Sequence, residues 1–277
     1  MPKVSIRGVS RCYEWFKEPE NSDKPVMVFI HGWGGSSQYW RSTAEQLTEN
    51  FNCLIYDLKG FGGSFLTDKY KGKFDLAGYV LELSELLDTL KIGGDIVLNA
   101  HSMGASIAAL FTAQYPEKVR QLILNCNGVF EYDERAFSIF QKIGKGIVQF
   151  RYPWFKNIPL MDQVAISRFL YRPIKKADRQ QFLEDFLIAD NRAAVGTLVG
   201  AVNKEMVVRI SEAFRQIQCP TLFLSGEKDK IIPAAMAKKA IALNPKLQYV
   251  EIPQVGHFPM LESPDIYQQE IRKFLQI

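Results

Sequence analysis

Strand-like and helix-like segments alternate along most of this 277-residue chain. Short, β-branched apolar runs between turn residues predict six strands: Val26–Ile30, Cys53–Tyr56, Ile96–Asn99, Val119–Leu124, Thr221–Leu224 and Gln248–Ile252. Four of these runs are almost continuously apolar, which is typical of strands that are covered on both faces in a parallel sheet. The alternation therefore predicts an α/β fold with a mostly parallel sheet.

Helical patterns fill the intervals between these strands. They span Ser37–Glu49, Leu76–Leu90, Ala105–Gln114, Ala234–Leu243 and Pro264–Leu275, and the first opens with a candidate serine N-cap. Two earlier runs, Val4–Val9 and Cys12–Phe16, flank Ser10-Arg11 and predict an antiparallel hairpin. With the hairpin, we expect a sheet of eight strands with helices on both faces.

The alternation stops between residues 131 and 211. This stretch is rich in aromatic residues, has no convincing strand, and is interrupted by Pro153, Pro159 and Pro173. It holds 13 Lys and Arg against 9 Asp and Glu, so it carries the whole net charge of 34 − 30 = +4. We predict a helical cap at 131–211, inserted after the sixth strand, between core segments 1–130 and 212–277. Additional core helices are the alternative, and the basic excess is either a solvated face or an attractor of acidic substrates or an anionic membrane.

Composition excludes several classes of protein. Hydrophobic residues make up 47% and charged residues 23%, as in an ordinary globular domain. The small net charge comes without a basic motif, so no nucleic-acid partner is expected. No apolar run reaches the ~18 residues of a transmembrane helix, and the first residues lack the apolar core of a signal peptide. We therefore expect a soluble, cytoplasmic protein.

The four cysteines predict neither a metal site nor a redox motif. Cys12, Cys53, Cys126 and Cys219 form no C-x-x-C pair, and three of them lie in or beside apolar runs. Buried free thiols are the expectation, and no metal or cofactor is predicted.

A candidate nucleophile follows the apolar strand Ile96–Asn99. In the run Asn99-Ala100-His101-Ser102-Met103-Gly104-Ala105, Ser102 has a small residue two positions to each side, Ala100 and Gly104. A tight turn between a strand and a helix needs small residues there, and it holds the hydroxyl above the sheet at the positive end of the helix.

A serine hydroxyl needs a base, and the chain has only three histidines. His257 lies in a loop after the last predicted strand and is the best candidate. An acid must orient that base, and both Glu227 and Asp229 follow the strand Thr221–Leu224. We favour Asp229, because the turn leaves it facing the next helix. The strand end at Asn125-Cys126-Asn127 offers no carboxylate.

A serine that attacks a carbonyl group also needs hydrogen-bond donors for the oxyanion that forms. His31-Gly32-Trp33-Gly34-Gly35 follows the strand Val26–Ile30, and a glycine-rich turn exposes backbone N–H groups. We predict the N–H groups of Trp33 and Met103 as the oxyanion donors. The side chains of Trp33 and His101 are expected to contact the substrate.

These pieces resemble the α/β-hydrolase superfamily, in the subgroup that has a helical cap. They are H-G-W-G-G, Y-D-L-K-G-F-G-G-S at Tyr56–Ser64, A-H-S-M-G-A, G-E-K-D and G-H-F-P, in the order of the family. The resemblance implies that the first piece is the oxyanion loop, the third carries the nucleophile, and the last two carry the acid and the base. It also implies a structural role for Asp57.

The resemblance and the serine together imply acyl transfer. Family members that cleave carbon–halogen bonds or open epoxides use an aspartate nucleophile, so Ser102 argues against both reactions. The prediction is an esterase that acts on a small apolar molecule, with thioesters and lactones as related substrates. Carbon–carbon hydrolysis, lyase chemistry and slow-turnover ligand reception are the alternatives. The natural substrate and the oligomeric state stay open at this point.

Overall fold

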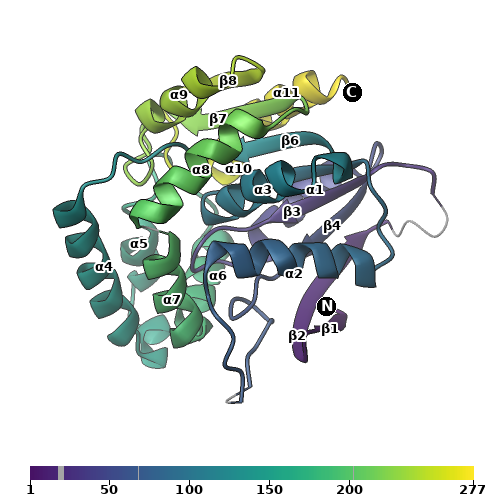
Figure 1. Ribbon diagram of the computed structural model, residues 1–277. Coiled ribbons are helices and arrows are strands. Elements are labelled where there is room, and N and C mark those ends of the chain that lie inside the picture. Colours follow the sequence, from purple (N-terminus) through teal and green to yellow (C-terminus); the bar gives the residue numbers. More distant parts are fainter. Residues whose placement is uncertain (18–21, 68, 202) are drawn as a thin grey trace.

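Eight strands form one sheet in the computed structural model, which describes residues 1–17, 22–67, 69–201 and 203–277 (Figure 1). They are β1 Lys3–Ile6, β2 Val9–Phe16, β3 Val26–Ile30, β4 Asn52–Tyr56, β5 Ile96–His101, β6 Val119–Asn125, β7 Thr221–Gly226 and β8 Leu247–Ile252. Their spatial order is β1-β2-β4-β3-β5-β6-β7-β8. β2 pairs antiparallel with both β1 and β4, and the other neighbours are parallel. The predicted sheet of eight mostly parallel strands is confirmed.

The helices fall into two sets along the chain. One set alternates with strands: α1 Arg41–Leu47, α2 Leu76–Thr89, α3 Met103–Gln114, α9 Ala234–Leu243, α10 Pro259–Glu262 and α11 Pro264–Leu275. The other set lies between β6 and β7: α4 Glu134–Gln149, α5 Met161–Ile166, α6 Lys176–Ile188, α7 Asn191–Ala201 and α8 Lys204–Gln216. Figure 1 shows α4 to α7 grouped at one side of the sheet.

Apolar side chains cover both faces of the sheet. Along β3, Val28 and Ile30 join a buried cluster with residues of α2, α3, α8 and α9, whereas Met27 and Phe29 join another with α1 and α11. All four side chains are fully buried. Because successive residues of a strand point to opposite faces, a strand between two helical layers must be apolar throughout. This confirms the prediction of helices on both faces.

The predicted hairpin forms, but its turn is not where we expected it. β1 and β2 connect through Arg7-Gly8, with Ile6 opposite Val9, and β2 runs unbroken through Ser10 and Arg11. Arg7 and Gly8 have φ of 50° and 73°. A two-residue hairpin turn favours positive φ at both central positions, and glycine meets that requirement at low cost. The Arg-Gly pair was the local signal for the turn.

The first predicted helix begins differently as well. Ser36, not Ser37, provides the cap: its hydroxyl accepts a hydrogen bond from the Gln38 N–H at 3.3 Å. Ser37 is buried and opens a 3-10 turn, and its N–H donates to Asp57 Oδ1 at 2.8 Å. The other oxygen of Asp57 accepts from the Gly63 N–H at 2.8 Å. Asp57 thus has the structural role that the resemblance implied.

The expected end of the cap at residue 211 falls inside a helix. α8 continues from Lys204 to Gln216, packs against α3, and contributes Phe214 to the core cluster beneath it. The predicted end of the cap therefore lies within a continuous helix that packs on the core, and the division of the chain into core and cap stays a prediction.

The cysteines are free thiols, as expected. Cys12, Cys53 and Cys126 are buried, and Cys219 is half-buried. Within the described ranges, no helix combines the length and the apolar character needed to cross a bilayer.

Candidate active site

Ser102 lies on a strained turn between β5 and α3. Its φ of 54° and ψ of −120° are unfavourable for a residue with a side chain, and such strain is concentrated at functional sites. Hydrogen bonds from both sides hold this conformation: the Ser102 N–H donates to the Asn125 carbonyl at 2.9 Å, and Asn127 Nδ2 donates to the Ser102 carbonyl at 2.8 Å. A Cβ at Gly104 would lie 2.4 Å from the His31 carbonyl oxygen, so this close approach requires glycine.

The structure brings Ser102, His257 and Asp229 into one hydrogen-bonded chain. His257 Nε2 lies 3.1 Å from Ser102 Oγ, and His257 Nδ1 lies 2.7 Å from Asp229 Oδ2. The Asp229 carboxylate is fully buried, and its other oxygen accepts the N–H groups of Ile231 at 2.7 Å and Ile232 at 3.0 Å. With one carboxylate oxygen held by these donors, the other accepts the Nδ1–H of His257, which leaves Nε2 free to accept from the Ser102 hydroxyl.

Glu227, the competing acid, takes no part in these hydrogen bonds. It pairs with Lys228 at 2.8 Å and accepts the Gln254 N–H at 2.8 Å. Its pKa is lowered by these surface partners, first by Lys228. At the end of β6, Asn125 Nδ2 donates to Asn99 Oδ1 and to the Ala100 carbonyl, both at 2.8 Å. The geometry therefore favours Asp229.

The glycine-rich loop after β3 lies against the nucleophile turn. A Cβ at Gly32 would be 3.1 Å from Ser102 Cβ and 3.0 Å from His101 Nδ1. Met103 is the first residue of α3, so its N–H has no partner within the helix. The Trp33 ring points to the helical segment between β6 and β7, called the insertion below. Its Nε1 donates to the Ala194 carbonyl of α7 at 3.0 Å, and the ring packs 5.8 Å from Phe186.

His101 does not have the position that we expected for a substrate contact. It is 1% exposed, and both ring nitrogens have protein partners: Nε2 with the His257 carbonyl at 2.7 Å and Nδ1 with Tyr39 Oη at 3.0 Å. Burial and the nearby His257 lower the pKa of His101 well below its usual value, so the ring is neutral. Because the His257 carbonyl can only accept, the neutral His101 donates from Nε2, and its Nδ1 accepts the Tyr39 hydroxyl proton. His101, at the end of β5, thus connects the His257 loop to the 3-10 turn that contains Tyr39.

A buried carboxylate that the sequence analysis did not single out supports the His257 loop. Glu262 Oε2 accepts the N–H groups of Gly256, Tyr171 and Arg172 at 2.9, 2.7 and 2.8 Å, and Oε1 accepts that of Phe258 at 3.0 Å. Two of these donors flank His257, and two belong to the insertion. The one available signal was a glutamate directly after the largely apolar run 255–261.

His257 also contacts the insertion directly. The His257 N–H donates to the Phe169 carbonyl at 2.7 Å, and the two rings lie 5.9 Å apart. Phe182 of α6 packs against Phe169 at 5.4 Å and against Phe258 at 5.8 Å. Phe169 of the insertion therefore contacts His257 directly, and Phe182 packs behind it.

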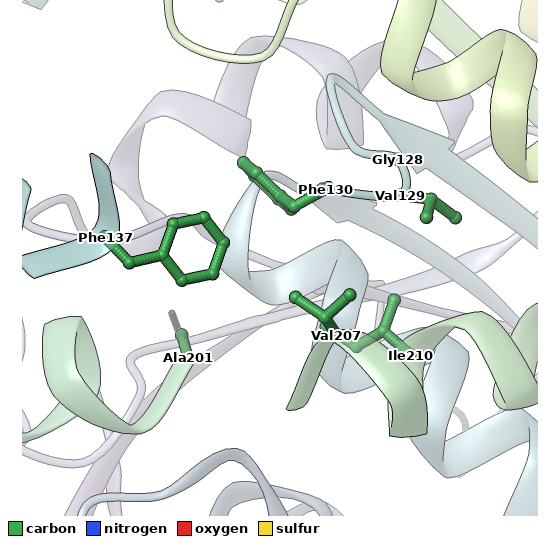
Figure 2. Close-up of a pocket in the computed structure, with 7 residues that line it drawn as sticks. All are labelled: Gly128, Val129, Phe130, Phe137, Ala201, Val207 and Ile210. Carbon is green, nitrogen blue, oxygen red and sulfur yellow. The ribbon is translucent and has the colours of Figure 1, made fainter. Parts of the chain in front are cut away.

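Small cavities mark the contact between insertion and core. Figure 2 shows apolar residues converging from the segment after β6 and from α4, α7 and α8 around a space of about 10 Å³. They are Gly128, Val129, Phe130, Phe137, Ala201, Val207 and Ile210. A space of about 10 Å³ has room for little more than one water molecule, so this pocket is a packing feature rather than a substrate site.

Among the described residues, one group of side chains has ligand atoms close enough for a metal ion. The nitrogen and sulfur atoms of His101, Cys126 and His257 lie within 4.8 Å of one another. The four imidazole nitrogens are already engaged with Asp229, Ser102, Tyr39 and the His257 carbonyl. Burial also raises the pKa of the Cys126 thiol, which keeps it protonated. A metal ion bound here would have to break the hydrogen bonds that join Asp229, His257 and Ser102.

Residues 25–264 match the family model of the alpha/beta hydrolase fold. The chain belongs to this family. It is 26% identical to a 2-(acetamidomethylene)succinate hydrolase of Mesorhizobium japonicum, covering 92% of this chain and 90% of that protein. It is 25% identical to Lipase 1 of Psychrobacter immobilis, covering 95% of this chain and 80% of the lipase.

A solved structure shows the same fold. A thermophilic esterase from Thermogutta terrifontis superposes on this alpha/beta hydrolase with a TM-score of 0.78, covering 100% of this chain and 98% of the esterase at 22% identity. At that identity the similarity establishes the architecture alone. The reaction of this alpha/beta hydrolase has to be argued from its own residues.

Proposed function

We propose that this alpha/beta hydrolase is a serine hydrolase that cleaves carboxylic esters of a small apolar molecule through an acyl-enzyme. The observation that carries the proposal is the continuous chain from Asp229 through His257 to the strained Ser102. Such a chain activates a hydroxyl that is otherwise a poor nucleophile.

The reaction would begin with attack of Ser102 Oγ on the ester carbonyl carbon. His257 Nε2 accepts the serine proton, and Asp229 stabilises the imidazolium without taking a proton. The N–H groups of Trp33 and Met103 stabilise the oxyanion, each by about 3 kcal/mol. His257 then donates its proton to the departing alcohol oxygen. Water attacks the acyl-enzyme, His257 accepts its proton and returns it to Ser102, and the acid leaves.

We propose α4 to α7 as the cap that selects the substrate. Support comes from the aromatic side chains near the base, Phe169 and Phe182 of the insertion and Phe258 of the core loop. Apolar walls with few polar groups favour a substrate with an apolar acyl or alcohol part.

The test is hydrolysis of p-nitrophenyl esters with acyl chains of increasing length, using the wild type, Ser102→Ala and the exposed control Ser138→Ala. We expect kcat to fall by about 10⁴-fold or more in Ser102→Ala and to stay unchanged in Ser138→Ala. Mass spectrometry after treatment with an organophosphate should find one adduct, on Ser102. A p-nitroanilide with the preferred acyl group shows whether amides are cleaved too.

Two results would overturn the proposal. One is a folded wild-type protein that hydrolyses no ester in the series. The other is a Ser102→Ala variant that keeps wild-type turnover, because another group would then be the nucleophile.

A further inference from the structure

One face of α4 is apolar and open to solvent. Ile139, Phe140, Ile143, Ile147 and Phe150 follow helical spacing along it, and between 47% and 64% of each residue is exposed. At 3.6 residues per turn, these five positions fall within an arc of about 100°. Figure 1 shows α4 at the margin of the molecule, where it packs against α7. The five residues are called the outer face of α4 below.

A different stripe of the same helix attaches it to the protein. Val148 is buried, and a Cβ at Gly144 would lie 2.8 Å from Leu198 of α7. Phe137 lines the small pocket of Figure 2. The helix therefore has the apolar contacts that fold it against α7, and the outer face is an additional apolar surface.

Aromatic residues continue this surface at the end of α4. Tyr152 and Trp154 are 45% and 56% exposed, and their rings stack with centroids 6.0 Å apart. Tyrosine and tryptophan have an apolar body and a polar tip, which suits the boundary between lipid tails and water.

The surrounding segment is strongly basic. Residues 135–176 contain nine Lys and Arg and a single acidic residue, Asp162, which gives 9 − 1 = +8, whereas the rest of the chain carries (34 − 9) − (30 − 1) = −4. The nine are Arg135, Lys142, Lys145, Arg151, Lys156, Arg168, Arg172, Lys175 and Lys176. Lys142 and Lys145 are exposed on α4, and neither has an acidic partner within the described part of the chain. At least these two positive charges thus lie on the same helix as the outer face.

We propose that the outer face of α4 binds the surface of an anionic lipid bilayer. The helix would lie in the plane of the membrane, with its exposed isoleucine and phenylalanine side chains at the boundary of the acyl chains and its lysines at the phosphates. A second copy of the chain is a poorer partner, because it would place one basic segment against another. The inference stands apart from the proposed ester chemistry, since it uses none of the residues near Ser102.

Flotation of the full-length protein with vesicles tests the proposal. We expect the wild type to float with phosphatidylcholine–phosphatidylglycerol vesicles at low salt, but not with pure phosphatidylcholine, and to be released by high salt. The double variants Ile143→Ser/Ile147→Ser and Lys142→Gln/Lys145→Gln should each reduce the partition coefficient by about tenfold. Val208→Ser, at a 62% exposed position on α8, is the matched control and should bind as the wild type does. An unchanged Tm shows that each variant is folded.

Three results would overturn the proposal. The wild type could stay in solution with both kinds of vesicle. It could bind anionic vesicles equally well after either double substitution. Sedimentation velocity could also show a dimer that Ile143→Ser/Ile147→Ser dissociates while vesicles bind nothing, in which case the outer face joins two copies.

Discussion

The side chain of Glu262 contacts the loop that carries His257, the proposed base. The Glu262 carboxylate accepts four backbone N–H groups, from the His257 loop and from the segment at residues 171 and 172. Hydrogen bonds to an ionised acceptor are stronger than those to a neutral one, and burial strengthens them further. Glu262 therefore couples the position of the base to the position of the insertion, which makes it a positioning residue.

Substitution of Glu262 by Gln should impair turnover more than binding. The amide keeps one acceptor oxygen but sets an NH2 group against backbone donors, so we expect a loss of about 2–4 kcal/mol in the free energy of unfolding. With esters, kcat should fall while KM changes little, because His257 loses its alignment and the aromatic contacts remain. Steady-state kinetics and urea unfolding measure both effects. The control is Glu205→Gln, at a side chain that is 79% exposed. A rise in KM with unchanged kcat would refute the positioning role.

At the level of elements, α6 contacts the turn at Ser36, which follows the glycine-rich loop, through the buried side chain of Asp185. Asp185 Oδ2 accepts the Ser36 hydroxyl at 2.6 Å, and Oδ1 accepts the side-chain amide of Gln181 at 2.9 Å. Burial raises the pKa of Asp185 to about 7, even though both hydrogen bonds lower it. The contact between α6 and the core therefore changes charge near neutral pH.

Asp185 should make the protein less stable as the pH rises. A carboxyl group whose pKa is higher in the folded state binds its proton more tightly there, so the stability it contributes is complete below about pH 4 and lost by about pH 7. The difference between the folded and unfolded pKa of Asp185 corresponds to at most about 4 kcal/mol in the free energy of unfolding. Asp185→Asn should remove this pH dependence, and urea unfolding between pH 5 and 8 measures it. Glu205→Gln, at a side chain that is 79% exposed, is the control. An equal slope in wild type and Asp185→Asn would contradict the assignment.

At the scale of the whole molecule, the insertion and the core share one apolar interior. Val148, Ala193, Ala194 and Leu198 of α4 and α7 belong to the same buried cluster as the strands β3, β5 and β6. A shared core makes unfolding cooperative, because neither part can separate without exposing apolar surface.

Leu198→Ala tests whether the two parts unfold together. Removal of this buried side chain should cost about 2–5 kcal/mol. It should shift a single urea transition seen equally by circular dichroism and by tryptophan fluorescence. The neighbouring Val199, which is 36% exposed, gives the control Val199→Ala, for which we expect less than about 1 kcal/mol. Two separate transitions, with only one of them moved by Leu198→Ala, would show that the insertion folds on its own.

The sequence by itself determined the strands of the parallel sheet and the candidate nucleophile turn. Both can be predicted from short stretches of chain, because a strand between two helical layers is apolar throughout and a tight turn needs small residues around its serine. The hairpin turn at Arg7-Gly8 was equally local, and its signal was overlooked. The Ser102–Asp229–His257 assignment followed from the same short segments and stays a prediction until the serine is tested.

Only the tertiary structure decided which side chains meet. The sequence favoured Asp229 over Glu227 only through the expected direction of a turn. The structure shows the physical difference: two backbone N–H groups donate to Asp229, whereas Glu227 pairs with Lys228 at the surface. The partners of His101 and Glu262 lie up to 156 residues away along the chain, and α8 joins the core because of its contact with α3. Propensity and spacing describe neighbours in sequence, whereas burial, pKa and hydrogen bonding depend on neighbours in space.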